Sequence, residues 1–253
     1  MSYGFQPPKI EDSDFWLGSG LLGSKEINPS GDWKLSLPRF EFQSKGIETS
    51  ACVTFTILSD IETLEKFQYG NEPNYSDRYI AKLSGTDPAR GNDPKKVCEA
   101  IRKYGLVNEE DWPFVDDINE YYKEIPSALI EKGKKWLEKN EFGYEYVDTD
   151  KIDIARKRSP VSAAVYAWAL NEKGEYIRLG SSNHYTLNFN EDNISRIVMF
   201  DTYENPIIKT LAKDHNVEFA QMYTLRRKEL KEKKSFWRQI LEYFFGSYRG
   251  GPI

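Results

Sequence analysis

The sequence has few of the residues that build disulfide scaffolds and zinc sites. Its 253 residues include two cysteines, Cys52 and Cys98, and two histidines, His184 and His215. Two cysteines are too few for a disulfide-rich secreted scaffold, so a reducing compartment is the simpler expectation. None of the four is paired with another at metal-ligand spacing, which argues against a structural zinc site. What remains is a thiol with an imidazole far downstream, a combination with its own chemistry.

Long apolar runs and a secretory leader are also absent. No run of about 18 apolar residues occurs, so a transmembrane segment is excluded. The first residues lack a basic stretch followed by an apolar one, so we expect no signal peptide. The net charge of −5, without a dominant basic block, argues against a nucleic-acid partner. The length fits one large domain or two small lobes around a substantial core.

The first half of the sequence has the spacing of helices. Residues 1–38 are rich in Gly, Pro and Ser and predict an extended arm, ordered where its aromatic residues dock. Apolar residues from Val53 to Leu64 then recur at helical spacing and predict an amphipathic helix that Gly70 ends. Further helices are predicted over residues 76–84, 94–105 and 116–140.

The second half has the pattern of short strands. Segments rich in β-branched and aromatic residues, separated by Asn, Gly and Lys turns, occupy residues 160–203. Helices followed by strands predict an α+β protein, a helical lobe and then an antiparallel β-rich lobe, with a cleft between them. We divide the chain into an N-terminal arm, a helical lobe, a β-rich lobe and a C-terminal amphipathic helix with a tail: residues 1–38, 39–150, 151–225 and 226–253.

Cys52 is the candidate nucleophile. It falls in the first turn of the predicted helix, where unpaired backbone N–H groups and partial positive charge favour a thiolate and lower the pKa of the thiol. The alternative is a small buried core residue. Cys98 falls in the middle of a helix with nothing to stabilise a thiolate, so we expect it only to pack.

His184 and Asp201 are the candidate partners of that thiol. His184 begins a predicted strand and Asp201 ends the next one. Adjacent antiparallel strands would place the carboxylate beside the imidazole, where it accepts the ring N–H and orients the ring. A lone histidine is otherwise more often structural. His215 follows a predicted turn and is interpreted as a surface or turn residue.

From about Gln43 to Leu225 the sequence resembles the papain-like cysteine peptidases. The family's Gln…Cys-Gly-Ser-Cys-Trp segment resembles Gln43 followed by Thr-Ser-Ala-Cys-Val at residues 49–53. Its strand Gly-Pro-Val-Ser-Val-Ala-Ile resembles residues 159–165, and its glycine-rich turn and helix resemble residues 91–114. Its Asn-His-Ala-Val and Asn-Ser-Trp-Gly motifs resemble residues 183–186 and 201–204. The segments follow one another in the family's order.

The resemblance implies a cysteine peptidase that cleaves protein or peptide substrates without a metal or other cofactor. Cys52 would be the nucleophile, His184 the base and Asp201 the group that orients it. The side-chain amide of Gln43 would bind the oxyanion. Three further residues are implied to contact the substrate: Gly91, Tyr203 and Asn183.

The sequence departs from the family pattern in several places. Gln43 lies nine residues before Cys52, where the family usually has six, and Val53 replaces a tryptophan. Asp201 and Tyr203 replace the Asn and Trp of the last motif. The family's framework cysteines are absent, as in compact papain-like proteins of bacteriophages and bacteria, which fits a cytoplasmic or virion-associated protein. Two alternatives stay open: an inactive papain-like binding or structural module, and a cell-wall peptide endopeptidase or amidase.

The two ends of the sequence bear on this choice. The arm is turn-rich, unlike the helical pro-segment of the family, so control by the usual pro-segment is not expected. The arm either docks on the body or covers the cleft, and docking is the expectation. Residues 226–245 return to helical spacing, with a basic first half and an aromatic second half. Such a helix can pack on its own body or bind a protein partner or membrane surface.

Overall fold

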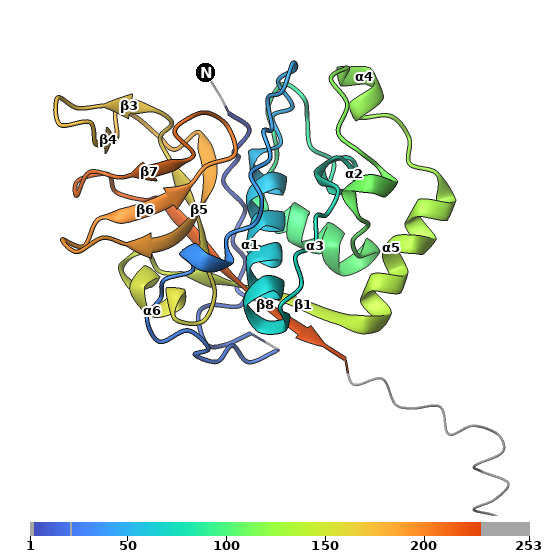
Figure 1. Ribbon diagram of the computed structural model, residues 1–253, viewed down its shortest axis with the longest axis horizontal. Helices are drawn as coiled ribbons and strands as arrows, with labels where there is room; N and C mark the ends of the chain where they lie inside the picture. Colours follow the sequence, from blue (N-terminus) through green and yellow to red (C-terminus); the bar gives the residue numbers. More distant parts are fainter. Residues whose placement is uncertain (1–2, 21, 229–253) are drawn as a thin grey trace, which may run out of the picture.

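The structure is a computed structural model that describes residues 3–20 and 22–228 (Figure 1). Helix α1 stands at the centre, with a sheet on one side and the other long helices on the opposite side. The helices are α1 (Cys52–Tyr69), α2 (Asp77–Leu83), α3 (Pro94–Tyr104), α4 (Ile118–Tyr121), α5 (Ser127–Lys139) and α6 (Ile152–Arg156). The strands are β1 (Asn140–Val147), β2 (Val161–Val165), β3 (Ala169–Leu170), β4 (Tyr176–Ile177), β5 (His184–Glu191), β6 (Ile197–Phe200), β7 (Ile208–Thr210) and β8 (Phe219–Arg227). The predicted α+β class is confirmed.

Local signals in the sequence account for the helix ends. Gly70 adopts φ 68° and donates its backbone N–H to Lys66 O, which ends α1 as predicted. The Asp93 side chain accepts a hydrogen bond from the Lys96 backbone N–H, and Pro94 follows as the first residue of α3. These two ends needed no tertiary contact to be recognised.

Helix α1 is more deeply buried than its sequence predicts. An amphipathic helix should keep one face in water, yet every residue from Cys52 to Glu65 is buried. The reason is its position, because α1 packs against β5, β8 and β2 on one side and α2 and α3 on the other. The N-terminal end of α1, where Cys52 lies, is thus enclosed by both halves of the molecule.

The main sheet is antiparallel, with the strand order β1-β8-β2-β5-β6-β7. Strands β2, β5 and β6 fall where the sequence predicts strands, whereas β1, β7 and β8 were not predicted. Arg226 and Arg227 belong to β8 rather than to the predicted helix over 226–245, because they pair with Glu141 and Asn140 of β1. The rest of that predicted helix, from residue 229, lies outside the described residues. The division of the chain into lobes at residues 38, 150 and 225 remains a proposal.

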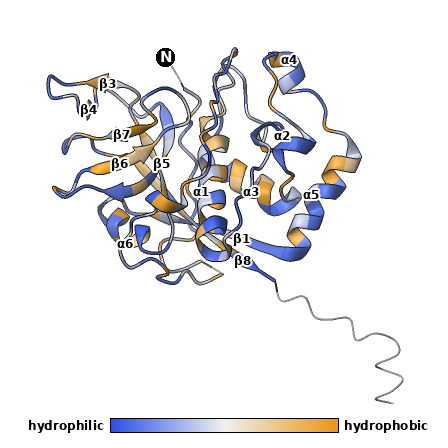
Figure 2. Ribbon diagram, viewed as in Figure 1, coloured by the Kyte–Doolittle hydropathy of each residue, from blue (hydrophilic) through white to orange (hydrophobic). Residues whose placement is uncertain are grey.

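The apolar core lies on both faces of this sheet. Figure 2 shows hydrophobic residues concentrated on α1, α3 and the central strands. One cluster joins the helices to the sheet and includes Ile57, Ile101 and Leu187. A second cluster covers the other face beneath α6, with Ile152 and Met199 among its members. Strand β5 therefore has both faces covered, and its first residue, His184, is fully buried.

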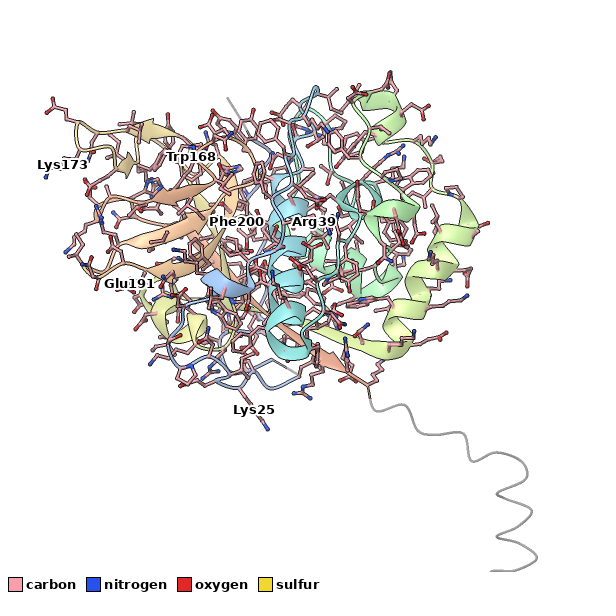
Figure 3. The ribbon with its side chains drawn as sticks, in the orientation of Figure 1. Lys25, Arg39, Trp168, Lys173, Glu191 and Phe200 are labelled. Carbon is pink, nitrogen blue, oxygen red and sulfur yellow. The ribbon has the colours of Figure 1, made fainter. Side chains whose placement is uncertain are left out.

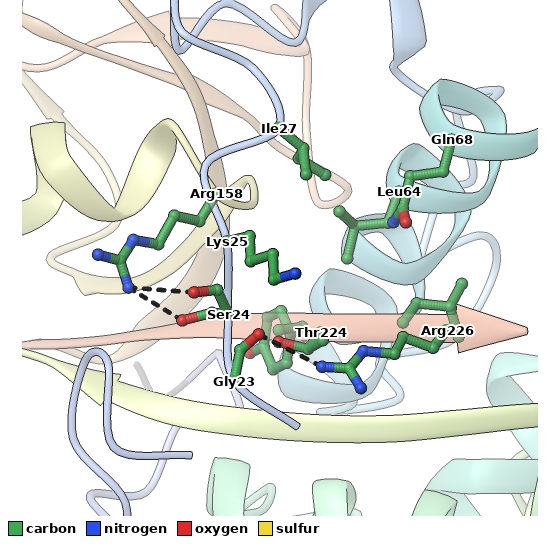
Figure 4. Close-up of a pocket in the computed structure, with 11 residues that line it drawn as sticks. Gly23, Ser24, Lys25, Ile27, Leu64, Gln68, Arg158, Thr224 and Arg226 are labelled. Atoms are coloured by element: carbon green, nitrogen blue, oxygen red, sulfur yellow. Dashed lines mark hydrogen bonds between the residues drawn. The ribbon is translucent and has the colours of Figure 1, made fainter. Parts of the chain in front are cut away.

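The arm runs between the sheet and α1 before it turns back along the body (Figure 1). It docks as expected: Leu17 donates its backbone N–H to Tyr146 O at 2.8 Å, and Trp33 is fully buried with its indole N–H on Arg156 O at 2.7 Å. Near the C-terminal end of α1, arm residues Gly23, Ser24, Lys25 and Ile27 line a pocket of about 200 Å³ together with β8 (Figure 4). This pocket lies at the end of α1 opposite Cys52.

Candidate active site

Cys52 is the first residue of α1, and its thiol faces the start of β5. The backbone N–H groups of Tyr185 and Val53 are near its sulfur and favour the thiolate. One turn along the helix, Thr56 Oγ1 donates to Tyr185 O at 2.8 Å, which fixes α1 against β5. The thiol therefore lies beside the backbone of the residue that follows His184.

His184 and Asp201 are adjacent in the structure. His184 opens β5, Asp201 follows β6, and the two strands are antiparallel neighbours. The imidazole Nε2–H donates to Asp201 Oδ1 at 2.7 Å, and both side chains are fully buried. The other ring nitrogen, Nδ1, is buried without a hydrogen-bond partner among the described residues. One ring nitrogen is thus fixed by a carboxylate, and the other is free to exchange a proton.

Asp201 has two further partners that sequence analysis did not find. Its Oδ2 accepts hydrogen bonds from the Trp168 indole N–H at 3.1 Å and from Lys209 Nζ at 2.7 Å. Burial raises the pKa of Asp201, but the adjacent His184 and Lys209 outweigh burial and hold it below the ordinary 3.8. Asp201 is therefore an ionised carboxylate inside the protein.

The family's last motif contains a tryptophan that this sequence replaces with Tyr203. Trp168 supplies a tryptophan ring at the site from another segment. Trp168 immediately precedes β3 in the chain and lies beside it in the structure (Figure 3). Its ring meets the His184 ring edge-on, with centroids 5.6 Å apart. The ring comes from a segment unrelated to the motif at residues 201–204, so motif comparison could not locate it.

Gln43 is held beside the motif at residues 201–204. Its backbone N–H donates to Thr202 O at 3.0 Å, and its Oε1 accepts from Thr202 Oγ1 at 3.2 Å. Its Nε2 is buried and has no hydrogen-bond partner among the described residues. Buried amide donors are almost always paired, so Gln43 Nε2 is one of the few such donors left without an acceptor in the described residues.

Residues Tyr3–Gln6 of the arm lie across this site. Asn92 donates its backbone N–H to Gly4 O at 2.8 Å, and Gln6 donates to Asn92 O at 2.9 Å. On the other side, Tyr3 donates its backbone N–H to Asn183 O at 3.0 Å. The segment therefore bridges a loop on the helical side and the start of β5.

Gly91 permits this close approach. A Cβ atom built on Gly91 would lie 1.8 Å from Gly4 O, so a side chain there would displace the arm. The structure thus brings Gly91 and Asn183 to the two sides of the covering segment.

Aromatic side chains anchor the covering segment. Phe5 is buried and stacks on Tyr185 at a centroid distance of 5.5 Å. The Tyr3 ring meets the rings of His184 and Tyr203 edge-on, at 5.8 Å and 4.6 Å. The arm therefore docks on the body, as expected, and its first aromatic residues also find ring partners at the site, which was the alternative.

The covered site changes the expected ionisation of Cys52. A helix N-terminus and two N–H groups favour the thiolate, but burial outweighs them and raises the pKa of the Cys52 thiol. The predicted lowering of this pKa is therefore wrong for the covered conformation. The thiol is in its protonated form at neutral pH.

The remaining cysteine and histidine have other surroundings. Cys98 is buried in α3 and packs in the core, and burial raises its pKa well above the ordinary value. His215 was interpreted as a surface or turn residue: it is in a turn, where its backbone N–H donates to Ala212 O at 2.9 Å, but at 3% exposed it is not on the surface. Its Nδ1–H donates to Tyr176 O at 3.0 Å and its Nε2 accepts the Tyr166 backbone N–H at 3.2 Å, which turns the ring inward.

Within residues 3–20 and 22–228, no group of three or more His, Cys, Asp and Glu side chains is arranged to hold a metal ion. In the same residues no helix has the length and apolar character needed to span a bilayer.

Solved structures similar to this one are cysteine proteases. Xylellain, a cysteine protease from Xylella fastidiosa, matches with a TM-score of 0.64 at 16% identity, over 91% of this chain and 97% of that chain. The cysteine protease and lectin-like domains of Cwp84 from Clostridium difficile match with a TM-score of 0.65 at 12% identity, over 90% and 57%. Digestive procathepsin L 3 of Tenebrio molitor matches with a TM-score of 0.58 at 14% identity, over 88% and 75%. The chain has the papain-like fold.

Sequence comparison adds little to this likeness of fold. No protein-family model matches the chain. A curated protein, the 2,3-bisphosphoglycerate-independent phosphoglycerate mutase of Flavobacterium psychrophilum, is 24% identical over 243 residues. That match covers 87% of this chain and 43% of the mutase, so the chain spans less than half of that relative's length.

Proposed function

We propose that the chain is a cysteine peptidase in which Cys52 and His184 carry out peptide-bond hydrolysis and Asp201 orients the imidazole. One observation carries the proposal. The thiol at the start of α1 lies beside the first residues of β5, and there the His184 ring has one nitrogen on a carboxylate and the other without a partner. A nucleophile, a base and an orienting group in this order are the elements of thiol-based acyl transfer.

The reaction follows from these groups. Cys52 Sγ gives its proton to His184 Nδ1 and attacks the carbonyl carbon of the peptide bond. When the tetrahedral intermediate collapses, the C–N bond breaks and His184 protonates the leaving amine. Water, deprotonated by His184, then attacks the thioester, which releases the acid and restores the thiol. The Gln43 Nε2 and the Cys52 backbone N–H would bind the oxyanion, each donor contributing about 10²- to 10³-fold in rate.

The conformation described is a covered one. Residues Tyr3–Gln6 occupy the space above Cys52 and His184, both of which have no exposed surface. A substrate reaches the sulfur only after this segment leaves. We therefore place the chain among peptidases with a latent state, in which Gly91, Asn183 and Tyr203 contact the arm first and the substrate after its release.

A non-catalytic papain-like module is the second candidate. The covering segment and the raised pKa of Cys52 favour it, because a permanently filled cleft needs no reactive thiol. The two candidates differ in whether Cys52 reacts once the segment is displaced.

The test uses the full chain carrying Phe5→Asp, which replaces the buried ring that anchors the segment. Hydrolysis of a fluorogenic peptide library and labelling by a thiol-directed epoxide are measured in this chain. Adding Cys52→Ala or His184→Ala should lower hydrolysis by at least about 10³-fold, since each removes a reacting group. Cys98→Ser is the matched control and should leave hydrolysis and labelling intact.

Two results would count against the peptidase. Hydrolysis that survives Cys52→Ala would show that another group is the nucleophile. A Phe5→Asp chain that neither hydrolyses peptides nor labels at Cys52 would establish the non-catalytic module instead.

A further inference from the structure

Lys209 is a buried cation in direct contact with the candidate site. It lies on β7, opposite Met199 of β6, and its side chain has no exposed surface. In this register it stands diagonally across from Asp201, close enough for a long side chain to reach. A fully buried lysine is rare unless it is paired.

Every donor of this ammonium group has an acceptor. Nζ contacts Asp201 Oδ2 at 2.7 Å, Glu204 O at 2.7 Å and Pro206 O at 2.6 Å. Three acceptors match the three N–H bonds of an ammonium group. The Trp168 ring lies 5.1 Å from Nζ, so an aromatic face also contributes. The position is built for a charged lysine.

We propose that Lys209 is a positioning residue that neutralises Asp201, so that the buried Asp201–Lys209 pair acts on His184 as a hydrogen-bond acceptor without net charge. The inference rests on the proposed function. The two carboxylate oxygens have separate tasks: Oδ1 binds His184, while Oδ2 binds Lys209 and Trp168. A carboxylate held at both oxygens cannot rotate away from the imidazole.

The neutral pair explains how an aspartate can stand where the resembled motif has an uncharged asparagine. An unbalanced carboxylate near Cys52 would oppose formation of the thiolate, because like charges repel in a medium of low polarity. Lys209 removes that net charge and leaves the hydrogen bond to His184 in place. The ion pair therefore accepts the hydrogen bond from His184 without net charge, as a neutral amide would.

Other titratable groups also face His184. Tyr203 and Tyr3 face the ring, and the Tyr203 hydroxyl donates to Glu48 at 2.6 Å. Glu204 acts electrostatically on Tyr3. Among these groups Lys209 alone is a cation in contact with Asp201, which makes its removal a specific change.

The test compares single and double substitutions in the full Phe5→Asp chain. The pH dependence of kcat/KM and of Cys52 alkylation by iodoacetamide is measured for each. Lys209→Met leaves one unbalanced negative charge, which favours the protonated states of its neighbours, so both limbs of the pH profile should move up by about one pH unit. Asp201→Asn leaves one unbalanced positive charge and should move both limbs down.

The double variant Asp201→Asn with Lys209→Met restores neutrality, so both limbs should return to their original positions. Lys213→Met is the matched control, because Lys213 is exposed and its loss changes the net charge by the same amount. It should leave the profile unchanged. Thermal unfolding of each variant checks that the fold is retained.

Single variants that leave both limbs in place, or a double variant as displaced as either single one, would overturn the role of Lys209. This failure is distinct from failure of the proposed function. A chain without Cys52-dependent hydrolysis contradicts the peptidase, while its alkylation profile still reports whether Lys209 balances Asp201.

Discussion

Ionisable residues are buried in this protein in two different ways. Asp201 keeps its charge because Lys209 and His184 surround it. Asp60, in the middle of α1, forms no ion pair within the described part of the chain and accepts a hydrogen bond from Ser162. Burial raises the pKa of Asp60 well above its ordinary value, because an apolar environment disfavours the charged form. The charged form is thus stabilised at Asp201, beside the candidate site, and disfavoured at Asp60.

His215 provides a prediction at the scale of one residue. Burial lowers the pKa of His215 below the ordinary 6.5, so below this pH the unfolded chain binds a proton that the folded chain does not bind. Stability should therefore fall as the pH drops below 6.5, by at most about 1.4 kcal/mol per pH unit from this residue. His215→Gln keeps a donor and an acceptor and should remove that dependence. Urea unfolding between pH 5 and pH 7.5 measures it.

The comparison is the difference in unfolding free energy between the original chain and His215→Gln. The carboxyl groups common to both chains cancel in this difference. If it stays constant across the pH range, His215 is not the group that titrates.

Two helices approach each other closely at Gly133, a feature of the helical elements rather than of any site. A Cβ atom on Gly133 of α5 would lie 2.5 Å from Tyr104 O and 2.4 Å from the Tyr79 hydroxyl oxygen. Helix propensity alone predicts that Gly133→Ala stabilises the protein by about 1 kcal/mol. The contact with a backbone oxygen opposes this, and we expect net destabilisation of about 1–3 kcal/mol.

Denaturant unfolding measures this balance. Lys135→Ala is the matched control on the same helix, because Lys135 is exposed and its loss should change stability by less than about 0.5 kcal/mol. A Gly133→Ala chain as stable as the original would show that α3 and α5 can separate without cost.

The elements also show which parts of the fold sequence patterns can predict. Helices α1 and α3 were predicted because their ends carry local signals, Gly70 and the Asp93–Pro94 pair. Strand β1 was missed because it follows α5 without a turn, so nothing local separates helix from strand. Strand β8 was missed because its first residues carry no turn signal and its last two were assigned to a helix. Strands β1 and β8 pair with each other across a long stretch of sequence, so no local sequence pattern indicates the pairing.

The same distinction applies to the candidate site. Cys52, His184 and Asp201 were singled out because each stands at an element end with a recognisable motif. Trp168 and Lys209 contact Asp201 only because β3 and β7 bring them there. For Lys209 the sequence carries one signal, a lysine within an apolar segment. This signal does not identify the residue with which the lysine pairs. The covering role of residues 3–6 likewise depends on tertiary contacts.

At the scale of the whole molecule, the arm links the two halves across the site. Its backbone bonds reach Asn92 on the helical side and Asn183 at the start of β5. Burial of Phe5 against Tyr185 contributes about 2 kcal/mol to this closure. Phe5→Asp should therefore raise the rate of Cys52 alkylation by about 30-fold, since about 1.4 kcal/mol corresponds to a factor of ten.

Mass spectrometry of the alkylated chain assigns the rate to Cys52. Ile10→Asp is the matched control, because Ile10 is also apolar and on the arm but is 45% exposed. Its alkylation rate should match that of the original chain. Equal rates for Phe5→Asp and the original chain would mean that the arm is not what shelters the thiol.

The strand order has a consequence for how the protein is made. Strand β8, the last strand of the described residues, lies between β1 and β2, which precede it in the chain. A nascent polypeptide still holding β8 inside the ribosome has a gap in the middle of its sheet, and α1 lacks part of the surface on which it packs. The arm precedes these elements in the chain, so its binding surface is complete only after nearly the whole described chain has been made. We therefore expect both the surroundings of the thiol and the docking of the covering segment to be completed late in synthesis.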